Sequence, residues 1–271
     1  MRFSAGILVA VAACCLLPAQ SSPKKSATAA KKATAPDPPA DPPKSEHRLT
    51  AEKTPTERLT YDVEWRLIHA GTAVIEAQKS SATLKLDSAG MVSTLFKVND
   101  TYSAAYDDGY CASAASMDSQ EGKRHHDTKV TYDREAGRAI YLERDLIKNS
   151  VLHSDNVQIP PCVHEVLGAF LKFRTMAPPP GQSSAIPMSD GRRFANVKID
   201  AQEREEVKTP AGTFKTIRCE ANMMNGVIYT RKGRVFLWVT DDEKRMPVQI
   251  RLRMNFPVGT VTLQLSKEER F

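Results

Sequence analysis

Two histidines and an aspartate stand side by side at His125, His126 and Asp127, and these residue types are common protein ligands of transition metals. The segment 126–133 is predicted to form a β-strand. Neighbouring side chains of a strand point to opposite faces of a sheet, so these three cannot easily converge on one ion. The sequence therefore predicts no metal site here.

Two further groups resemble parts of catalytic sites. His164 and Glu165 lack the second histidine of the zinc-protease pattern, because position 168 is Gly. Asp241 and Asp242 are paired carboxylates that could serve in acid–base catalysis, but they lie in a turn between two predicted strands, where aspartates are typical turn formers. No serine lies in a nucleophile elbow, and there is no glycine-rich phosphate loop. We therefore expect no cofactor and no enzymatic activity, and the alternative is an unrecognised hydrolase.

The five cysteines fall into two groups. Cys14 and Cys15 belong to the N-terminal apolar run, which leaves Cys111, Cys162 and Cys219. Cys219 lies on the apolar face of a predicted strand and is expected to be a buried free thiol. Cys111 and Cys162 lie beside turn-like and proline-rich segments, so we favour a disulfide between them. It would close a loop of about 50 residues and stabilise the fold by roughly 3–4 kcal/mol. The alternative is that all three are reduced and buried.

Residues 1–20 have the layout of a secretory signal peptide. Arg2 supplies a positive charge, Phe3–Leu17 are almost wholly apolar, and small residues follow. We expect cleavage at the end of this segment and export to the periplasm or beyond. The alternative is a lipoprotein anchored to a membrane through a lipidated Cys14. The apolar run is shorter than the roughly 20 residues of a membrane-spanning helix, so no span is expected after the signal is removed.

Residues 21–56 are rich in Lys, Ala and Pro, offer few apolar anchors, and are predicted to form a disordered linker. Residues 57–271 then form a single β-rich domain, which is long enough for one core. The formal net charge of the sequence is +6, with Lys and Arg scattered among acidic residues. Because the chain has no nucleic-acid-binding motif and is expected to be exported, we expect no nucleic-acid partner.

Alternation of apolar and polar residues predicts many β-strands, most clearly where Val248, Ile250 and Leu252 alternate with polar residues. Val235–Val239 is apolar at every position, as expected of a strand covered on both faces. The predicted strands are 61–67, 73–77, 91–98, 101–107, 126–133, 138–144, 193–200, 202–208, 214–222, 235–239, 248–256 and 261–265.

One amphipathic helix stands out among the strands. Pro160 and Pro161 set its start, apolar residues recur at spacings of three and four over Val163–Arg174, and the proline-rich segment 177–181 ends it. The fold class is therefore mainly β. We expect a curved antiparallel meander sheet, as a half-barrel or a partly closed barrel, with one main α-helix packed on its apolar surface.

Five parts of the chain carry a family resemblance: Leu59–Trp65 with Ala70-Gly71, Cys162–Arg174, Thr209–Thr216, Leu237–Asp242 with Arg245–Val248, and Val258–Val261. In this order they resemble a bacterial exported family called domain of unknown function 3108. The resemblance covers nearly the whole predicted domain and implies no assigned activity. It also implies a shape similar to the unclosed β half-barrels that carry lipoproteins between membranes. Several members carry an acidic residue and a serine in the helix, where this chain has Glu165 and Gly168, and this departure would alter a polar contact there.

A curved sheet covered by a helix can enclose an apolar hollow. Five aromatic residues are the predicted lining of that hollow: Trp65, Phe170, Phe173, Phe236 and Trp238. The alternative for each of them is that it simply fills the core. We therefore expect a non-catalytic envelope protein that binds a lipid-like or other apolar small molecule in the concave sheet. One alternative is an interaction or assembly module that binds another envelope protein, and the second is the hydrolase named above.

Overall fold

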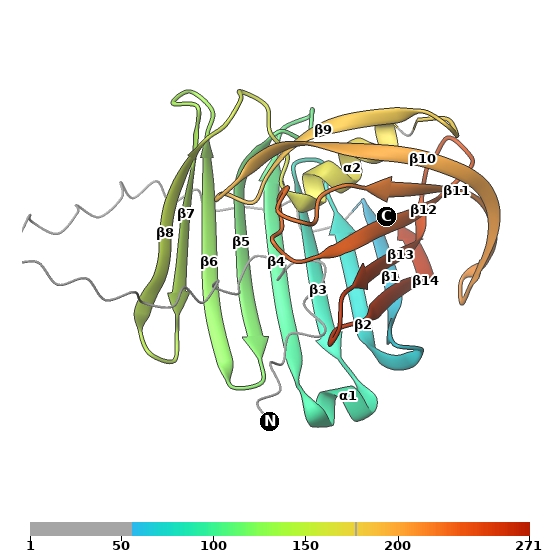
Figure 1. Ribbon diagram of the computed structural model, residues 1–271, viewed down its shortest axis with the longest axis horizontal. Coiled ribbons are helices and arrows are strands. Elements are labelled where there is room, and N and C mark those ends of the chain that lie inside the picture. The colour runs from blue at the N-terminus through green and yellow to red at the C-terminus, as the bar shows by residue number, and fades with distance from the viewer. Residues whose placement is uncertain (1–55, 177) are drawn as a thin grey trace, which may run out of the picture.

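The computed structural model describes residues 56–176 and 178–271 (Figure 1). The predicted signal peptide, the lipidation candidate Cys14 and the predicted linker up to residue 55 lie outside these residues. Within them, fourteen strands and two helices occur. The elements are β1 (Glu57–Trp65), β2 (Ile68–Ala77), β3 (Ser81–Ser88), α1 (Gly90–Leu95), β4 (Val98–Tyr106), β5 (Ala112–Glu121), β6 (Arg124–Asp133), β7 (Arg138–Asp145), β8 (Ser150–Gln158), α2 (Val166–Met176), β9 (Ser183–Ser189), β10 (Phe194–Thr209), β11 (Gly212–Ala221), β12 (Gly233–Thr240), β13 (Pro247–Met254) and β14 (Thr260–Arg270).

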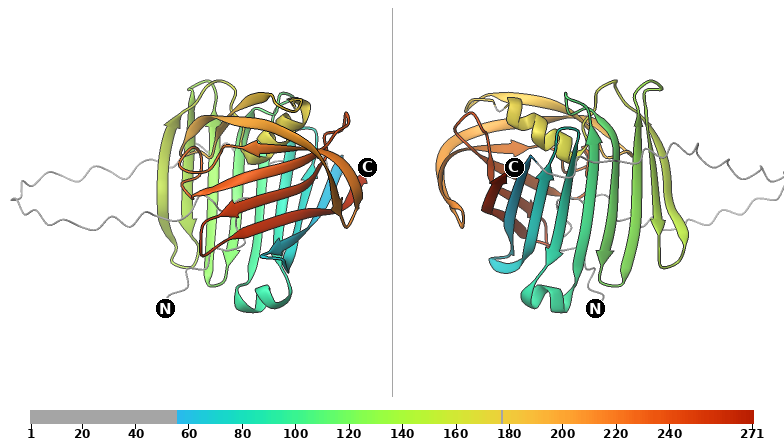
Figure 2. Two further views of the ribbon diagram at one scale, coloured as in Figure 1. Left: turned by 45° about the vertical axis from the view of Figure 1, so that its right-hand side comes forward. Right: turned by 180° about the vertical axis from the view of Figure 1, so that it is seen from behind.

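All fourteen strands belong to one antiparallel sheet in the order β8-β7-β6-β5-β4-β3-β2-β1-β14-β13-β12-β11-β10-β9. The chain starts in the middle of this sheet, because β1 pairs with both β2 and β14. The sheet curls strongly but does not close, so β8 and β9 are its two edges (Figures 1 and 2). Bulges interrupt the pairing of β1 on both sides, and bulges increase local twist. The predicted curved, mainly β, antiparallel fold is confirmed.

Side-chain alternation gives the curved sheet its two faces. In β1, Leu59, Tyr61 and Val63 are buried, whereas the residues between them are partly exposed. Inward-facing side chains of this kind from most strands join α2 in the main core. A smaller core, which includes Val130 and Tyr141, lies along β5–β7. No helix within residues 56–176 and 178–271 is long and apolar enough to cross a membrane.

α2 lies against the inner side of the curved sheet and packs on β3, β4 and β9 (Figure 2). The predicted helix exists, but its predicted start was too early. Residues just before Val166 are not helical, because His164 N–H donates to Pro187 O at 2.8 Å and Ser189 N–H donates to His164 O at 3.0 Å. These bonds tie the segment to edge strand β9 and delay the helix until Val166.

The structure differs from the strand predictions in two places. The segment 91–98 contains the short helix α1, because the chain must turn between the antiparallel neighbours β3 and β4, and only Val92 of this helix is buried. The predicted strands 193–200 and 202–208 are one continuous strand, β10, with a register shift between Ala201 and Arg204. Strands β3, β5, β8 and β9 were not predicted.

Candidate functional site

An apolar cavity of about 90 Å³ lies between α2 and the inner face of β9–β13. Phe170 and Phe173 of α2 form one side of the lining. Met223, Met224 and Tyr229, in the segment between β11 and β12, form another side. Tyr229 is the one lining residue with a polar side-chain atom that could bond to a ligand. The arrangement therefore offers contact with apolar groups and very little hydrogen bonding.

The structure separates the five aromatic residues that were predicted to share this lining. Phe170 and Phe173 line the cavity, whereas Trp65, Phe236 and Trp238 do not. Along β12, Val235 and Leu237 face the cavity, so the alternating residues Phe236 and Trp238 belong to the outer face. The prediction was thus wrong for three of the five residues.

Phe236 and Trp238 are nevertheless buried, because polar side chains cover them on the outer face. The Arg251 guanidinium lies 4.9 Å from the centre of the Trp238 ring, and Arg234 lies 4.8 Å from that of Phe236. Trp238 Nε1 donates a hydrogen bond to Glu205 Oε1 at 2.8 Å. These stacked cations shield the rings from water.

Trp65 occupies the end of β1, away from the cavity. Its Nε1 donates to Val258 O at 2.7 Å, and the Arg66 guanidinium lies 5.2 Å from its ring centre. The side chain packs on the rim of the main core. It therefore fills space and fixes the turn after β13, rather than lining the cavity.

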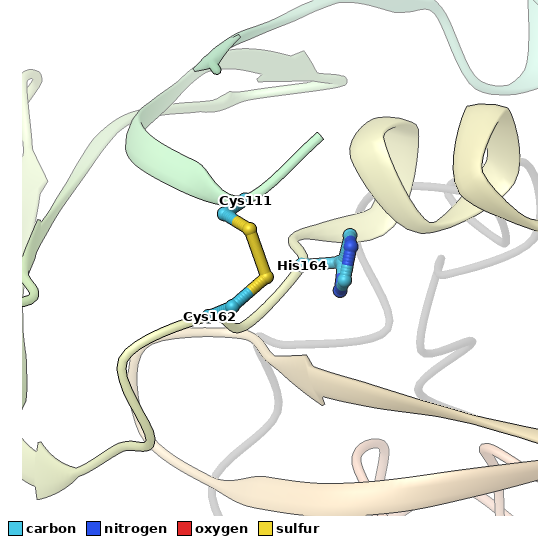
Figure 3. A group of neighbouring side chains, drawn as sticks. All are labelled: Cys111, Cys162 and His164. Carbon is cyan, nitrogen blue, oxygen red and sulfur yellow. A yellow bond between two sulfur atoms is a disulfide. The ribbon is translucent and has the colours of Figure 1, made fainter. Parts of the chain in front are cut away.

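A disulfide joins Cys111 to Cys162 immediately before the segment that leads into α2 (Figure 3). The predicted pairing is confirmed. His164 lies beside the bridge, with Nδ1 at 3.1 Å from Pro187 O and Nε2 at 3.4 Å from Gly109 O, and burial holds its pKa below the usual value. The two sulfurs and the imidazole lie within 4.8 Å of one another, but both thiols are consumed by the disulfide. This group is therefore an anchor for the helix start and not a metal-ligand set.

Glu165 caps the N-terminus of α2. Its carboxylate accepts hydrogen bonds from the Leu167 N–H at 2.7 Å and from the Gly168 N–H, and the Tyr102 hydroxyl donates to it at 3.0 Å. Burial raises the pKa of Glu165 to about 7. A Cβ on Gly168 would lie 2.8 Å from Glu165 Oε1 and 2.9 Å from Tyr110 O. The absence of a side chain at position 168 thus leaves room for the capping carboxylate.

A family model described as "Protein of unknown function (DUF3108)" matches residues 60–266. The chain belongs to this family. The resemblance found in its segments is therefore confirmed, and it spans almost all of the described DUF3108 domain. No curated protein matches the sequence.

Three solved structures are similar to this DUF3108 protein. A β-barrel-like DUF1849 protein from Brucella abortus has a TM-score of 0.51 at 8% identity, covering 80% of this chain and 98% of that chain. A Bacteroides fragilis protein with a YmcC-like fold, provisionally named as exported, has a TM-score of 0.28 at 10% identity, covering 80% and 97%. A Parabacteroides distasonis protein, provisionally named a lipoprotein, has a TM-score of 0.30 at 8% identity, covering 80% and 96%. Of the three, the Brucella protein alone exceeds 0.5, and its likeness shows the fold alone.

In the DUF3108 domain, His125 and His126 point to opposite faces of the sheet, as their adjacent positions in a strand predict. His125 Nε2 lies 2.8 Å from Asp118 Oδ1, whereas His126 Nδ1 lies 3.1 Å from Glu143 Oε1. His126 contacts the buried Glu143 on the inner face, whereas His125 is partly exposed on the other face of the sheet. Glu143 was not singled out in the sequence, because it comes from the neighbouring strand β7.

Asp241 and Asp242 are both engaged in the turn after β12. Asp241 forms ion pairs with Arg204 at 2.6 Å and with Arg245 at 3.3 Å, and its bond to Arg204 lowers its pKa. Asp242 Oδ1 accepts hydrogen bonds from the Thr240 hydroxyl at 2.6 Å and from backbone N–H groups that follow it. Their contacts are those of turn-forming residues.

A second cavity of about 400 Å³, with both polar and apolar lining, opens at the C-terminal end of α2. Arg174 of the helix makes a two-pronged ion pair with Glu57 at the start of β1, and Arg270 lies 3.2 Å from the same carboxylate. Although burial alone would raise the pKa of Glu57, Arg174 holds it below its usual value. The ion pair therefore fixes this end of α2, as the disulfide fixes the segment before its other end.

Proposed function

We propose that this DUF3108 protein is exported to the cell envelope and binds a lipid-like or other apolar ligand in the cavity beside α2, without catalysing a reaction. The strongest support for ligand binding is the lining of this cavity, where apolar side chains of the helix face apolar side chains of β9–β13. Cavities lined in this way stay dry and accept apolar molecules. The proposal of export rests on the signal-like sequence of residues 1–20.

The size of the cavity limits what it can hold as it stands. Its volume of about 90 Å³ is smaller than that of an engineered cavity of about 150 Å³ that binds benzene. It is also far below the roughly 300–1,000 Å³ of ordinary ligand pockets. A lipid-like ligand therefore requires neighbouring side chains to move.

Methionine side chains provide this freedom. Met188, Met223 and Met224 line the cavity, and methionine adapts readily because it is unbranched and has three rotatable bonds. Met223 and Met224 lie between β11 and β12, outside the strand ladder, whereas α2 is fixed near both ends by the disulfide and by the Arg174–Glu57 ion pair. We expect the methionine-bearing segment to move on binding, and the helix to stay in place.

The variant Ala221→Leu tests the proposal by filling the cavity. Ala221 lines it from β11, so the longer side chain occupies the space that a ligand would enter. In a fluorescence titration with N-phenyl-1-naphthylamine, an apolar probe, we expect the variant to bind about tenfold more weakly or worse than the wild type. Urea unfolding of the same samples shows whether the variant is folded.

Ala185→Leu is the matched control, because Ala185 is exposed on β9 and does not line the cavity. It should bind the probe like the wild type. A folded Ala221→Leu protein with unchanged probe affinity would contradict cavity binding. Solvent extraction of protein recovered from its own envelope, followed by mass spectrometry, should release an apolar molecule from the wild type and not from Ala221→Leu.

A further inference from the structure

Three side chains with metal-binding donor atoms lie on neighbouring strands on the inner face of the sheet near edge strand β8, with one histidine on either side of a glutamate. His126 belongs to β6, Glu143 to β7 and His153 to β8. Glu143 is paired directly with His153 across the ladder, and His126 lies diagonally opposite Glu143 on the other side. His126 Nδ1 lies 3.1 Å from Glu143 Oε1, and His153 Nε2 lies 4.0 Å from Glu143 Oε2.

Among the described residues, the carboxylate of Glu143 pairs with imidazoles rather than with a lysine or an arginine. Its side chain is only 2% exposed, and its ion-pair partners among the described residues are the two histidines. The Tyr141 hydroxyl donates a hydrogen bond to Oε2 at 3.2 Å. A buried carboxylate is costly unless a positive charge compensates it. A divalent cation bound between the carboxylate and the two imidazoles would supply such a charge.

We propose that His126, Glu143 and His153 bind one Zn²⁺ ion or a chemically similar first-row divalent ion. Two imidazole nitrogens and one carboxylate oxygen form a ligand set that zinc accepts, with bonds of about 2.0–2.2 Å and a fourth position left for water. Such bonds place the donor atoms roughly 3–3.5 Å apart, a spacing that His126 and Glu143 already have.

To complete the ligand set, His153 would rotate toward Glu143 and His126. Its side chain is 33% exposed on the edge strand, so it has room to turn toward the carboxylate. The hydrogen bond from Tyr141 orients the carboxylate in the way that outer partners orient ligands in established metal sites. The site is independent of the apolar cavity, because none of its three ligands lines that cavity.

The test is a zinc titration of the full chain, purified without a polyhistidine tag and freed of metal with a chelator. Competition with a chromophoric zinc chelator should show one ion bound per chain. His126→Ala and His153→Ala should each weaken zinc binding about 100-fold or more, because each removes one of three protein ligands. Zinc should also raise the melting temperature of the wild type, since an ion that binds the folded chain stabilises it.

His125→Ala is the matched control, because His125 is the adjacent residue on the opposite face, where it contacts Asp118. This variant should bind zinc like the wild type. Glu143→Gln removes the charge while keeping the side-chain volume, and it should lose zinc binding while remaining folded. The proposal is overturned if the wild type shows no one-to-one binding, if His125→Ala loses as much affinity as His126→Ala, or if folded His153→Ala keeps full affinity.

Discussion

The inner face of the sheet differs in character between the region around α2 and the strands β6–β8. Beside α2, side chains from β9–β13 are apolar and enclose the cavity. Along β6 and β7 the same face carries Thr128, Glu143 and Asp145 as buried polar residues. α2 packs on β3, β4 and β9 (Figure 1). On β7, the Arg192 guanidinium instead stacks on the ring of Tyr141, 5.3 Å from its centre. Apolar side chains gain free energy only where a covering layer removes them from water, so the position of the helix sets the chemistry of each region.

Phe173→Ala should give the largest loss of stability. It tests whether the region around α2 is packed more tightly than β6–β8. Phe173 is 2% exposed in the main core, and truncation of a buried phenylalanine costs about 3–5 kcal/mol. Val157→Ala is the counterpart on β8, where the side chain is only partly buried, and it should cost about 1 kcal/mol or less. Urea unfolding measures both losses. Similar values would show that the two regions are packed alike.

Removing the disulfide should give the next largest effect, because the bridge ties the start of β5 to the segment that leads into α2. Cys111 stands directly before β5, and Cys162 lies in the segment that leads into α2. The double variant Cys111→Ser with Cys162→Ser should lower the free energy of unfolding by roughly 2–4 kcal/mol. The wild type treated with a reducing agent should match it in urea unfolding. Equal stability of the oxidised wild type and the double variant would show that the bridge does not stabilise the fold.

Glu165 should make the helix-covered region sensitive to pH. Burial raises its pKa to about 7, above the 4.5 of an ordinary glutamate. Between these two values the folded chain binds more protons than the unfolded chain, so this group makes stability fall as pH rises. The stabilising contribution is complete below about pH 4.5 and is lost as pH rises through 7, with a size on the order of 3 kcal/mol.

Glu165→Gln isolates this effect, because glutamine keeps the shape but does not titrate. The free energy of unfolding of the wild type minus that of Glu165→Gln should fall steadily between pH 4.5 and 7 in urea unfolding series. A difference that stays constant over this range would rule out a raised pKa at the helix cap.

The strands that the sequence predicted best are those whose two faces differ most. Val248, Ile250 and Leu252 are buried in β13, and their alternation with polar residues is plain in the sequence. β8 was missed because it is an edge strand whose residues are all partly or largely exposed, so burial imposes no apolar alternation on Ser150–Gln158. Local pattern therefore predicts a strand only where tertiary packing buries one or both of its faces and so imposes apolar residues.

The sequence was equally unable to predict contacts between side chains on different strands. Val235–Val239 is apolar at every position, so the sequence could not tell that Phe236 and Trp238 face outward, beneath arginines that include Arg251 from β13. For His126, the argument that adjacent residues face opposite ways was correct, but Glu143 lies 17 residues further along the chain. Convergence across strands requires the register of the sheet, which periodicity alone does not give.

Gly168→Ala should have the smallest effect of the four changes considered. Whether it raises or lowers the free energy of unfolding is what makes it informative. Alanine normally stabilises a helix interior by about 1 kcal/mol relative to glycine. Here the new Cβ would lie 2.8 Å from Glu165 Oε1 and 2.9 Å from Tyr110 O, so we expect a net loss of about 1–3 kcal/mol in urea unfolding. Thr175→Ala, exposed on the same helix, is the control and should be neutral or slightly stabilising.

A double-mutant cycle with Glu165→Ala separates the two close contacts of Gly168→Ala. If the Glu165 carboxylate is the main obstacle, Gly168→Ala should lower the free energy of unfolding clearly less in the Glu165→Ala background. In that background the atom nearest to the new Cβ has been removed. The same cost in both backgrounds would instead assign the strain to the backbone carbonyl of Tyr110, which cannot move without disturbing the turn beside the disulfide. A gain of stability in the wild-type background would show that the carboxylate turns aside freely. Glu165 would then be too loosely held to cap α2.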